Sequence, residues 1–225
     1  MKKNYNKKIA ITTGDINGIG AEITIKALNS LSLNEDEVVI ISDKNHIKSF
    51  NLNKNYEIID IPYRGKIEYG KTTKESGDFA FNCLKKACEI TPKAIVTAPV
   101  SKSSLNLAGH KYNGQTEVLE YFLAHDGQKA EMLFVSKYFD VLLLTRHCAL
   151  KDIKITENII LDKVLRLYKF YKKYYNKTPK FALCSLNPHA GEDGLLGTEE
   201  ISIIIPAIEK LRNKIHLLII FLIVN

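Results

Sequence analysis

Residues 8–31, KIAITTGDINGIGAEITIKALNSL, join a short apolar run to an amphipathic pattern through three glycines. We predict a strand over Lys8–Thr13, a tight turn, and a helix over Ala21–Leu31, where apolar residues recur at helical spacing. Glycines permit close backbone approach, and a helix N-terminus favours anions. The spacing is not that of the dinucleotide fingerprint. The turn is therefore either structural or anion-binding, and Asp15 is either a helix cap or a site carboxylate.

The rest of the chain alternates short apolar runs with amphipathic patterns. Four further strands are expected: Val38–Ser42, Tyr56–Ile59, Ala94–Thr97 and Phe181–Ser185. Met132–Val135 and Val141–Leu144 are expected to form a hairpin. Five further helices are expected, the last of them interrupted near Pro206: Ser76–Ile90, Ser101–Ala108, Thr116–Ala124, Thr156–Tyr175 and Thr198–Leu211. Alternating strands and helices predict an α/β fold. We expect a largely parallel sheet with flanking helices, made mixed by the hairpin.

Composition is that of a globular protein of 225 residues, 45% of them hydrophobic, with a formal net charge of +7. The lysines are spread along the chain, with clusters only at residues 2–8 and 169–173. We interpret both clusters as solvated surface and expect no nucleic-acid partner. The positive balance suits an anionic small substrate such as a phosphate ester.

The four cysteines, Cys83, Cys88, Cys148 and Cys184, form no CxxC pair. This pattern predicts buried free thiols in a reducing cytoplasm. The basic start precedes an apolar run too short for a signal peptide, so a cytoplasmic location is expected.

The last residues, 215–225, read IHLLIIFLIVN. This apolar run is shorter than the ~20 residues that a membrane span needs, so no membrane association is expected. It is either a final buried strand or an out-of-frame translation. On this basis residues 1–225 are treated as a single, incomplete α/β region.

Two histidines each follow a strand-like run: His147 in TRHCALKD and His189 in NPHAGE. Loops after strands often carry ligands and catalytic groups, and a pair of imidazoles can supply part of a metal site. A structural role for both histidines is the equally weighted alternative. The remaining histidines lack such a setting and are treated as ordinary: His46, His110, His125 and His216.

Two further polar positions open predicted helices. Lys102 stands at a helix start, where the dipole disfavours a cation, so it is expected either to hold an anionic ligand or to be a surface lysine. In Asn113–Glu117, Gln115 or Thr116 is expected to cap the helix. The alternative is that this stretch holds a phosphate or carboxylate.

In this order along the chain, GDINGIGAE, TAPVSK, AGHKYNGQTE, TRHCALKD and NPHAGEDGLLGTEE resemble the 4-hydroxythreonine-4-phosphate dehydrogenase family of vitamin B6 biosynthesis. The resemblance runs from about residue 9 to residue 211. It implies an isocitrate/isopropylmalate-dehydrogenase-like fold with two interwoven lobes, and a homodimer. It also implies NAD and a divalent metal, which would be zinc, magnesium or cobalt. The implied reaction oxidises 4-phosphooxy-L-threonine to a 3-oxo acid, which loses carbon dioxide.

Position by position, the resemblance implies metal ligation by His147 and His189 and substrate binding by Thr116. Gln115 falls where many members have histidine, so it can donate a hydrogen bond but cannot carry an imidazolium charge. The family's third metal ligand would lie beyond residue 225, and no counterpart is assigned here. Two alternatives remain: a dehydrogenase of another phosphorylated hydroxy acid such as 4-phosphothreonate, or an inactive truncated fragment.

Overall fold

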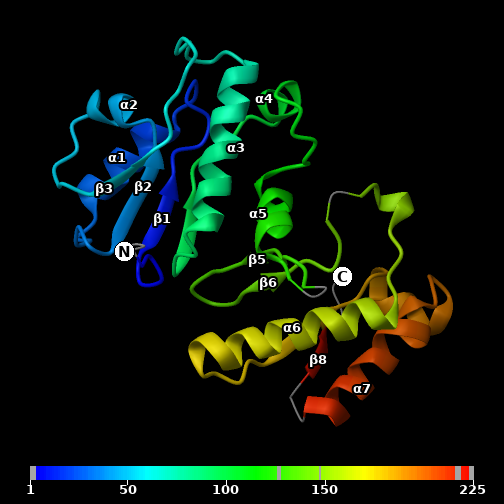
Figure 1. Cartoon of the computed structure of the whole chain (residues 1–225). Helices are drawn as coiled ribbons and strands as arrows, with labels where there is room; N and C mark the ends of the chain where they lie inside the picture. Colours follow the sequence, from blue (N-terminus) through cyan, green and yellow to red (C-terminus); the bar gives the residue numbers. More distant parts are fainter. Residues whose placement is uncertain (1–3, 126–127, 147, 216–218, 223–225) are drawn as a thin grey trace. The chain divides into compact units, whose positions relative to one another are not determined.

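The computed structural model describes residues 4–125, 128–146, 148–215 and 219–222 (Figure 1). The chain divides into two compact units, Met1–Ala130 and Glu131–Asn225, and each is described by itself.

The first unit is built on a four-stranded parallel sheet in the order β3-β2-β1-β4. Its strands are β1 (Ile9–Thr12), β2 (Val38–Ser42), β3 (Glu57–Asp60) and β4 (Ala94–Thr97). Every residue of β2 is buried, as expected for a strand of a parallel sheet covered on both faces. Because β1 pairs with both β2 and β4, the loops that follow β1 and β4 emerge side by side.

Helices flank this sheet: α1 (Gly20–Ser30) packs on one face and α3 (Lys74–Glu89) on the other, and α2 (Lys44–Lys48) lies beside β3. The helices α4 (Lys102–Leu107) and α5 (Gln115–Leu123) pack against α3. Alternate strand residues point to opposite faces, so the sheet supports two separate cores. Ile11 and Ile40 pack in the core that includes Ile25 of α1. Ala10 and Ile41 pack in the core that includes Phe79 of α3.

The second unit contains a hairpin, two helices and a strand pair. These are β5 (Leu133–Phe134) with β6 (Val141–Leu142), α6 (Glu157–Tyr175), β7 (Phe181–Cys184) with β8 (Ile219–Leu222), and α7 (Ile205–Ile215). Short helical turns lie at Leu150–Asp152, Pro188–Gly194 and Glu200–Ile204. A core that includes Ile160, Val164, Ile208 and Leu211 joins α6 to α7.

The structure confirms the α/β class with a parallel sheet and flanking helices. The hairpin is antiparallel as predicted, but among the described residues it forms a two-stranded sheet of its own and does not make the four-stranded sheet mixed. The final strand is present as β8, paired in parallel with β7. The interruption near Pro206 is also confirmed: a π-helical turn over Glu200–Ile204 precedes α7.

One expectation needs correction, and one helix was not predicted. Cys83 and Cys88 are buried as expected, but Cys148 and Cys184 are exposed. Cys184 is exposed because side chains alternate between the two faces of β7. The five-residue helix α2 was not predicted, since it is too short for a helical period; the Asp43 side chain caps it by accepting from the His46 N–H. None of the helices in the described ranges is long and apolar enough to cross a membrane.

Candidate functional site

The loops after β1 and β4 touch through their backbones. The N–H of Asp15 donates to the carbonyl oxygen of Pro99 at 3.0 Å. Gly14 has φ +72°, and a Cβ there would lie 2.1 Å from that same oxygen. Only glycine fits this position without displacing the neighbouring loop. The glycine-rich turn therefore fixes the carboxyl-end edge of the sheet, where open α/β proteins bind ligands.

Asp15 anchors this turn and does not cap the helix. The N-cap of α1 is Ile19, without a side-chain hydrogen bond, so the capping alternative is wrong. The Asp15 side chain is buried; one carboxylate oxygen accepts from the Asn17 N–H at 2.9 Å and the other from the Ser104 hydroxyl at 3.0 Å. Both oxygens are thus occupied by the fold, and the turn is tied to α4.

The start of α5 lies against the loop that follows β4. The N-cap of α5 is Gly114, with no side-chain cap, so capping by Gln115 or Thr116 is wrong: both lie in the first helical turn. The Gln115 Nε2 donates to the carbonyl oxygen of Ala98 at 3.1 Å. Its Oε1 is buried and has no hydrogen-bond partner among the described residues. A buried acceptor without a partner is costly, and a bound donor would relieve that cost.

Lys102 reaches the same place. It is the first residue of α4, which Ser101 caps by accepting from the Ser104 N–H at 3.1 Å. The Lys102 Cε lies 3.7 Å from the position that a Cβ on Gly114 would occupy, and the Glu117 Oε2 lies 3.4 Å from it. The Lys102 side chain and the Glu117 carboxylate therefore both lie beside the first turn of α5, where helix N–H groups favour anions. The structure brings Lys102, Gln115 and the Thr116 backbone to one site.

In the second unit, the loop after β7 is organised around Glu200. This side chain is 1% exposed, and its Oε1 accepts from the N–H groups of Leu186 and Asn187 at 2.8 and 2.7 Å. The Asn187 Nδ2 donates to the Glu200 Oε2 at 2.8 Å. Burial acts to raise the Glu200 pKa, but the hydrogen bonds from Asn187 and Leu186 outweigh it and hold the pKa below its usual value.

His189 opens a run of five residues, up to Asp193, that all have positive φ. Such angles are rare for residues other than glycine and are costly unless the surroundings impose them. Here Gly191 packs against Gly197, with its missing Cβ only 2.6 Å from the Gly197 carbonyl oxygen. The backbone thus holds the exposed His189 in a specific loop shape, which is typical of a functional position.

The other predicted metal ligand, His147, lies outside the described residues. Among the residues that are described, no three His, Cys, Asp or Glu side chains lie close enough to hold a metal ion. The described donor set therefore does not make a metal site by itself. Ligation by His147 and His189 stays a prediction.

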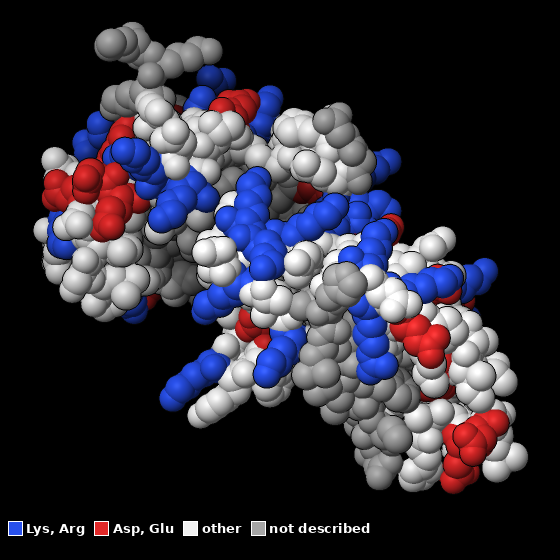
Figure 2. All heavy atoms as spheres, turned by 90° about the horizontal axis from the view of Figure 1, so that it is seen from below, with Lys and Arg blue, Asp and Glu red and all other residues white. Residues whose placement is uncertain are grey.

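Basic residues are spread over the surface. Figure 2 shows Lys and Arg side chains projecting from many places on the face seen from below, with acidic groups at several separate spots. Lys169, Lys172 and Lys173 of α6 are exposed, as the solvated-surface interpretation predicts. That no nucleic acid binds stays a prediction.

Residues 7–220 match the model of the family described as pyridoxal phosphate biosynthetic protein PdxA. The chain belongs to the PdxA family. This PdxA chain is 34% identical to D-threonate 4-phosphate dehydrogenase of Salmonella typhimurium, over 92% of its own length and 72% of that protein. It is 31% identical to 4-hydroxythreonine-4-phosphate dehydrogenase of Bacteroides thetaiotaomicron, over 92% of its length and 64% of that protein.

Solved structures agree with this PdxA assignment. The structure of a putative 4-hydroxythreonine-4-phosphate dehydrogenase from Salmonella typhimurium matches with a TM-score of 0.81 and 31% identity, over 95% of this chain and 74% of that one. The Klebsiella pneumoniae 4-hydroxythreonine-4-phosphate dehydrogenase matches with the same TM-score and 29% identity, over 97% and 74%. The chain is thus a PdxA-type dehydrogenase, an oxidoreductase related to enzymes of phosphorylated threonine compounds.

Sequence reasoning missed two anchoring residues. Glu200 lies in one of the motifs, NPHAGEDGLLGTEE, but a charged side chain is ordinarily expected at the surface, so its burial was not predicted. Asn17 fixes residues 68–73: its Oδ1 accepts from the Glu68 N–H, and its Nδ2 donates to the Lys71 carbonyl oxygen. Both act over long sequence separations, which no local pattern reveals.

Proposed function

We propose that this protein catalyses the NAD-dependent, divalent-metal-dependent oxidation of 4-phosphooxy-L-threonine to a 3-oxo acid. That acid decarboxylates to 3-amino-2-oxopropyl phosphate, within pyridoxal 5'-phosphate (vitamin B6) biosynthesis. The observation that carries the proposal is the convergence of Lys102 and Gln115 at the start of α5, in a chain of the PdxA family. A cation, a buried acceptor and helix N–H groups suit a small substrate that bears several charged groups.

Each side chain has a distinct proposed role. Gln115 is held by the Ala98 carbonyl oxygen, so its Oε1 is oriented to accept from a substrate hydroxyl or ammonium. Thr116 offers a hydroxyl and a first-turn N–H to the same substrate. Lys102 holds an anionic group of the substrate. It is also the candidate for proton transfer, and no other catalytic residue is assigned. His147 and His189 are the proposed metal ligands.

The proposed reaction needs NAD⁺ as its only oxidant. The substrate's C3 hydroxyl loses its proton, and C3 gives a hydride to NAD⁺, leaving a ketone and NADH. The β-keto acid then loses carbon dioxide, and the resulting enol takes up a proton. A divalent zinc, magnesium or cobalt ion, when bound, supplies Lewis-acid polarisation of the reacting hydroxyl. The chain's own side chains bind and orient the substrate, and this positioning lowers the barrier to the reaction.

Homodimerisation is part of the proposal. The β5–β6 hairpin exposes five large apolar side chains, of which Tyr138 is 83% exposed: Phe134, Val135, Tyr138, Phe139 and Val141. A cluster of this kind marks an interaction surface, and a second copy of the chain is the proposed partner. We also place the reaction in the cytoplasm, where the free thiols described here would stay reduced.

A second candidate substrate is 4-phosphothreonate. The similarity to D-threonate 4-phosphate dehydrogenase favours it, as does a neutral carboxamide at position 115. 4-Phosphothreonate has a hydroxyl where 4-phosphooxy-L-threonine has an ammonium group. The oxidation would otherwise be the same.

The deciding experiment follows NADH formation by the full chain with NAD⁺, each substrate separately, and Zn²⁺, Mg²⁺ or Co²⁺. Faster turnover of 4-phosphooxy-L-threonine supports the main proposal, and faster turnover of 4-phosphothreonate supports the alternative. Loss of activity in Gln115→Ala, with Lys85→Gln on the outer side of α3 as the matched control, would tie the activity to this site. If neither substrate yields NADH with any of the metals, the proposed activity is wrong for this chain.

A further inference from the structure

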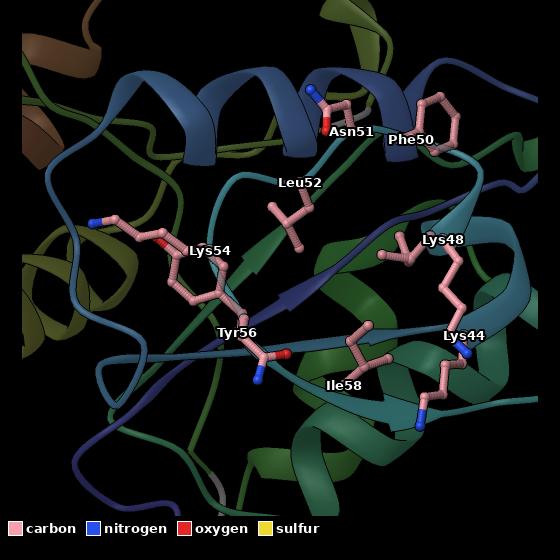
Figure 3. Close-up of a pocket in the computed structure, with 10 residues that line it drawn as sticks. Lys44, Lys48, Phe50, Asn51, Leu52, Lys54, Tyr56 and Ile58 are labelled. Carbon is pink, nitrogen blue, oxygen red and sulfur yellow. The ribbon is translucent and has the colours of Figure 1, made fainter.

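A cavity lies at the β3 edge of the sheet, away from the candidate site at β1 and β4. Its volume is about 380 Å³, within the usual range for small-molecule sites. Figure 3 shows Lys44 and Lys48 on one side of it and Lys54 on the opposite side, with Leu52 and Ile58 between them. Neither the family match nor the proposed activity gives this cavity a role.

The charge that lines the cavity is entirely positive. Three lysines line it, and no Asp or Glu does. Lys44 and Lys48 are one helical turn apart on α2, where like charges repel, and neither takes part in an ion pair in the described ranges. The Lys54 Nζ donates to the Leu33 carbonyl oxygen at 2.6 Å, and in Figure 3 its side chain extends away from Lys44 and Lys48, so these two are the ammonium groups left to meet an anion. An anion bound between Lys44 and Lys48 would relieve their repulsion.

Acids near the cavity are engaged with backbone groups; the Glu35 Oε1, for example, accepts from the N–H of the lining residue Asn55 at 2.6 Å. The Asp43 carboxylate accepts from the N–H groups of His46 and Tyr63 at 2.7 and 2.9 Å. The Asp60 carboxylate accepts from the Lys44 N–H at 2.8 Å. Both aspartates fix the ends of α2 and β3, and neither lines the cavity. They therefore position the lysines without neutralising the side-chain ammonium groups.

Most of the remaining lining side chains are apolar, and Asn51 and Asn55 are the two uncharged polar members of the wall. Tyr56 and Ile47 are 3% and 1% exposed and belong to the core beneath the cavity. Phe50 is held in place because its ring meets the His46 ring edge-on, with centroids 5.2 Å apart. A wall of this kind favours the apolar body of a ligand, since burying that surface stabilises the complex.

From this combination we infer a binding site for a phosphate monoester with an aromatic or aliphatic body, separate from the substrate site. The phosphate lies between the ammonium groups of Lys44 and Lys48. The organic part lies against Leu52, Phe50 and Tyr56. Lysine suits this role because it binds phosphate as a point charge from several directions.

The test uses 1-naphthyl phosphate as the ligand, with the full chain, and maps backbone amide NMR shifts. We expect saturable binding, shifts concentrated at residues 44–58, and much weaker binding of 1-naphthol or inorganic phosphate. Lys44→Gln/Lys48→Gln should weaken binding by about tenfold or more, and roughly 0.5 M salt should weaken it as well. Both lysines are exposed, so the double variant should keep the wild-type circular dichroism spectrum.

The matched control is Lys85→Gln/Lys86→Gln, which removes the same charge from α3. It should change the affinity less than about twofold, because it leaves the cavity intact. An equal loss in this control would show that net charge alone is responsible and would overturn the proposal. Shifts confined to the glycine turn at residues 14–20, or no saturable binding at all, would overturn it too. None of these outcomes depends on catalytic activity.

Discussion

The Gln115 Nε2 donates to the Ala98 carbonyl oxygen, and this hydrogen bond orients the side chain at the start of α5. Because the donor end is occupied, the buried Oε1 is the end that can meet a ligand. Gln115 therefore presents a fixed, neutral acceptor at the candidate site.

Replacing Gln115 with alanine should remove both the anchor and the acceptor. We expect the dissociation constant for the phosphorylated substrate to rise about tenfold, the effect of one hydrogen bond to a charged group. Gln115→His should keep most of the affinity, because an imidazole can also hydrogen-bond at this position. Calorimetric titration of both variants checks this; equal losses in the two would contradict the orientation argument.

Gly14→Ala should destabilise the first unit strongly. The new Cβ would meet the Pro99 carbonyl oxygen at 2.1 Å in a left-handed residue, so the two loops must separate. We expect a loss of about 3–5 kcal/mol in the free energy of unfolding. Gly70→Ala is the matched control: its φ is +76°, but nothing lies within 4 Å of the new Cβ. It should cost only about 1–2 kcal/mol. Urea denaturation of the two variants should separate the clash from the backbone angle.

Glu200→Gln should loosen the loop that carries His189. The amide can still accept from Leu186 and Asn187, but its NH₂ group faces the Asn187 amide and one hydrogen bond is lost. Hydrogen exchange at the Leu186 and Asn187 amides should report a loss of about 1–3 kcal/mol in protection. The exposed Glu209→Gln on α7 should leave both amides unchanged; a similar loss there would argue against a specific role for Glu200.

The pH dependence of this loop follows from the same carboxylate. The pKa of Glu200 is lower in the folded protein than its usual value of 4.5, so the unfolded chain binds the proton more readily. The stabilisation is complete above that value and is lost as the pH falls through the folded pKa. Wild-type protection should therefore decline below about pH 4.5, and the difference from Glu200→Gln should shrink in parallel.

His46 should produce a second pH effect, in the first unit. Burial lowers the His46 pKa below 6.5, outweighing the opposing effect of Asp43. The unfolded chain then binds the proton first, so stability falls as the pH drops from 6.5 through the lower folded pKa. His46→Gln should flatten this decline in urea denaturation measured between about pH 7.5 and pH 5. His110→Gln leaves His46 in place and should retain the slope.

Local patterns predicted most of the secondary structure. β2 and β4 were placed at their observed bounds, and α1 within one residue at each end. The predictions failed where the outcome depended on contacts distant in sequence. Asp15 was expected either as a cap, which is wrong, or as a site carboxylate, which stays a prediction; one of its oxygens accepts from the Ser104 hydroxyl, 89 residues away. Gln115 was expected to cap its own helix and instead bonds to Ala98.

The sequence by itself determined the α/β class, the family, and the residues that form the motifs, because these depend on residue identity and on the spacing of apolar side chains. Only the tertiary structure decided that Lys102 and Gln115 share one site, that Glu200 anchors the loop around His189, and that three lysines line one cavity. These relationships follow from which loops the parallel sheet and its helices bring together. The packing of residues far apart in the chain sets them, and no short stretch of sequence encodes that packing.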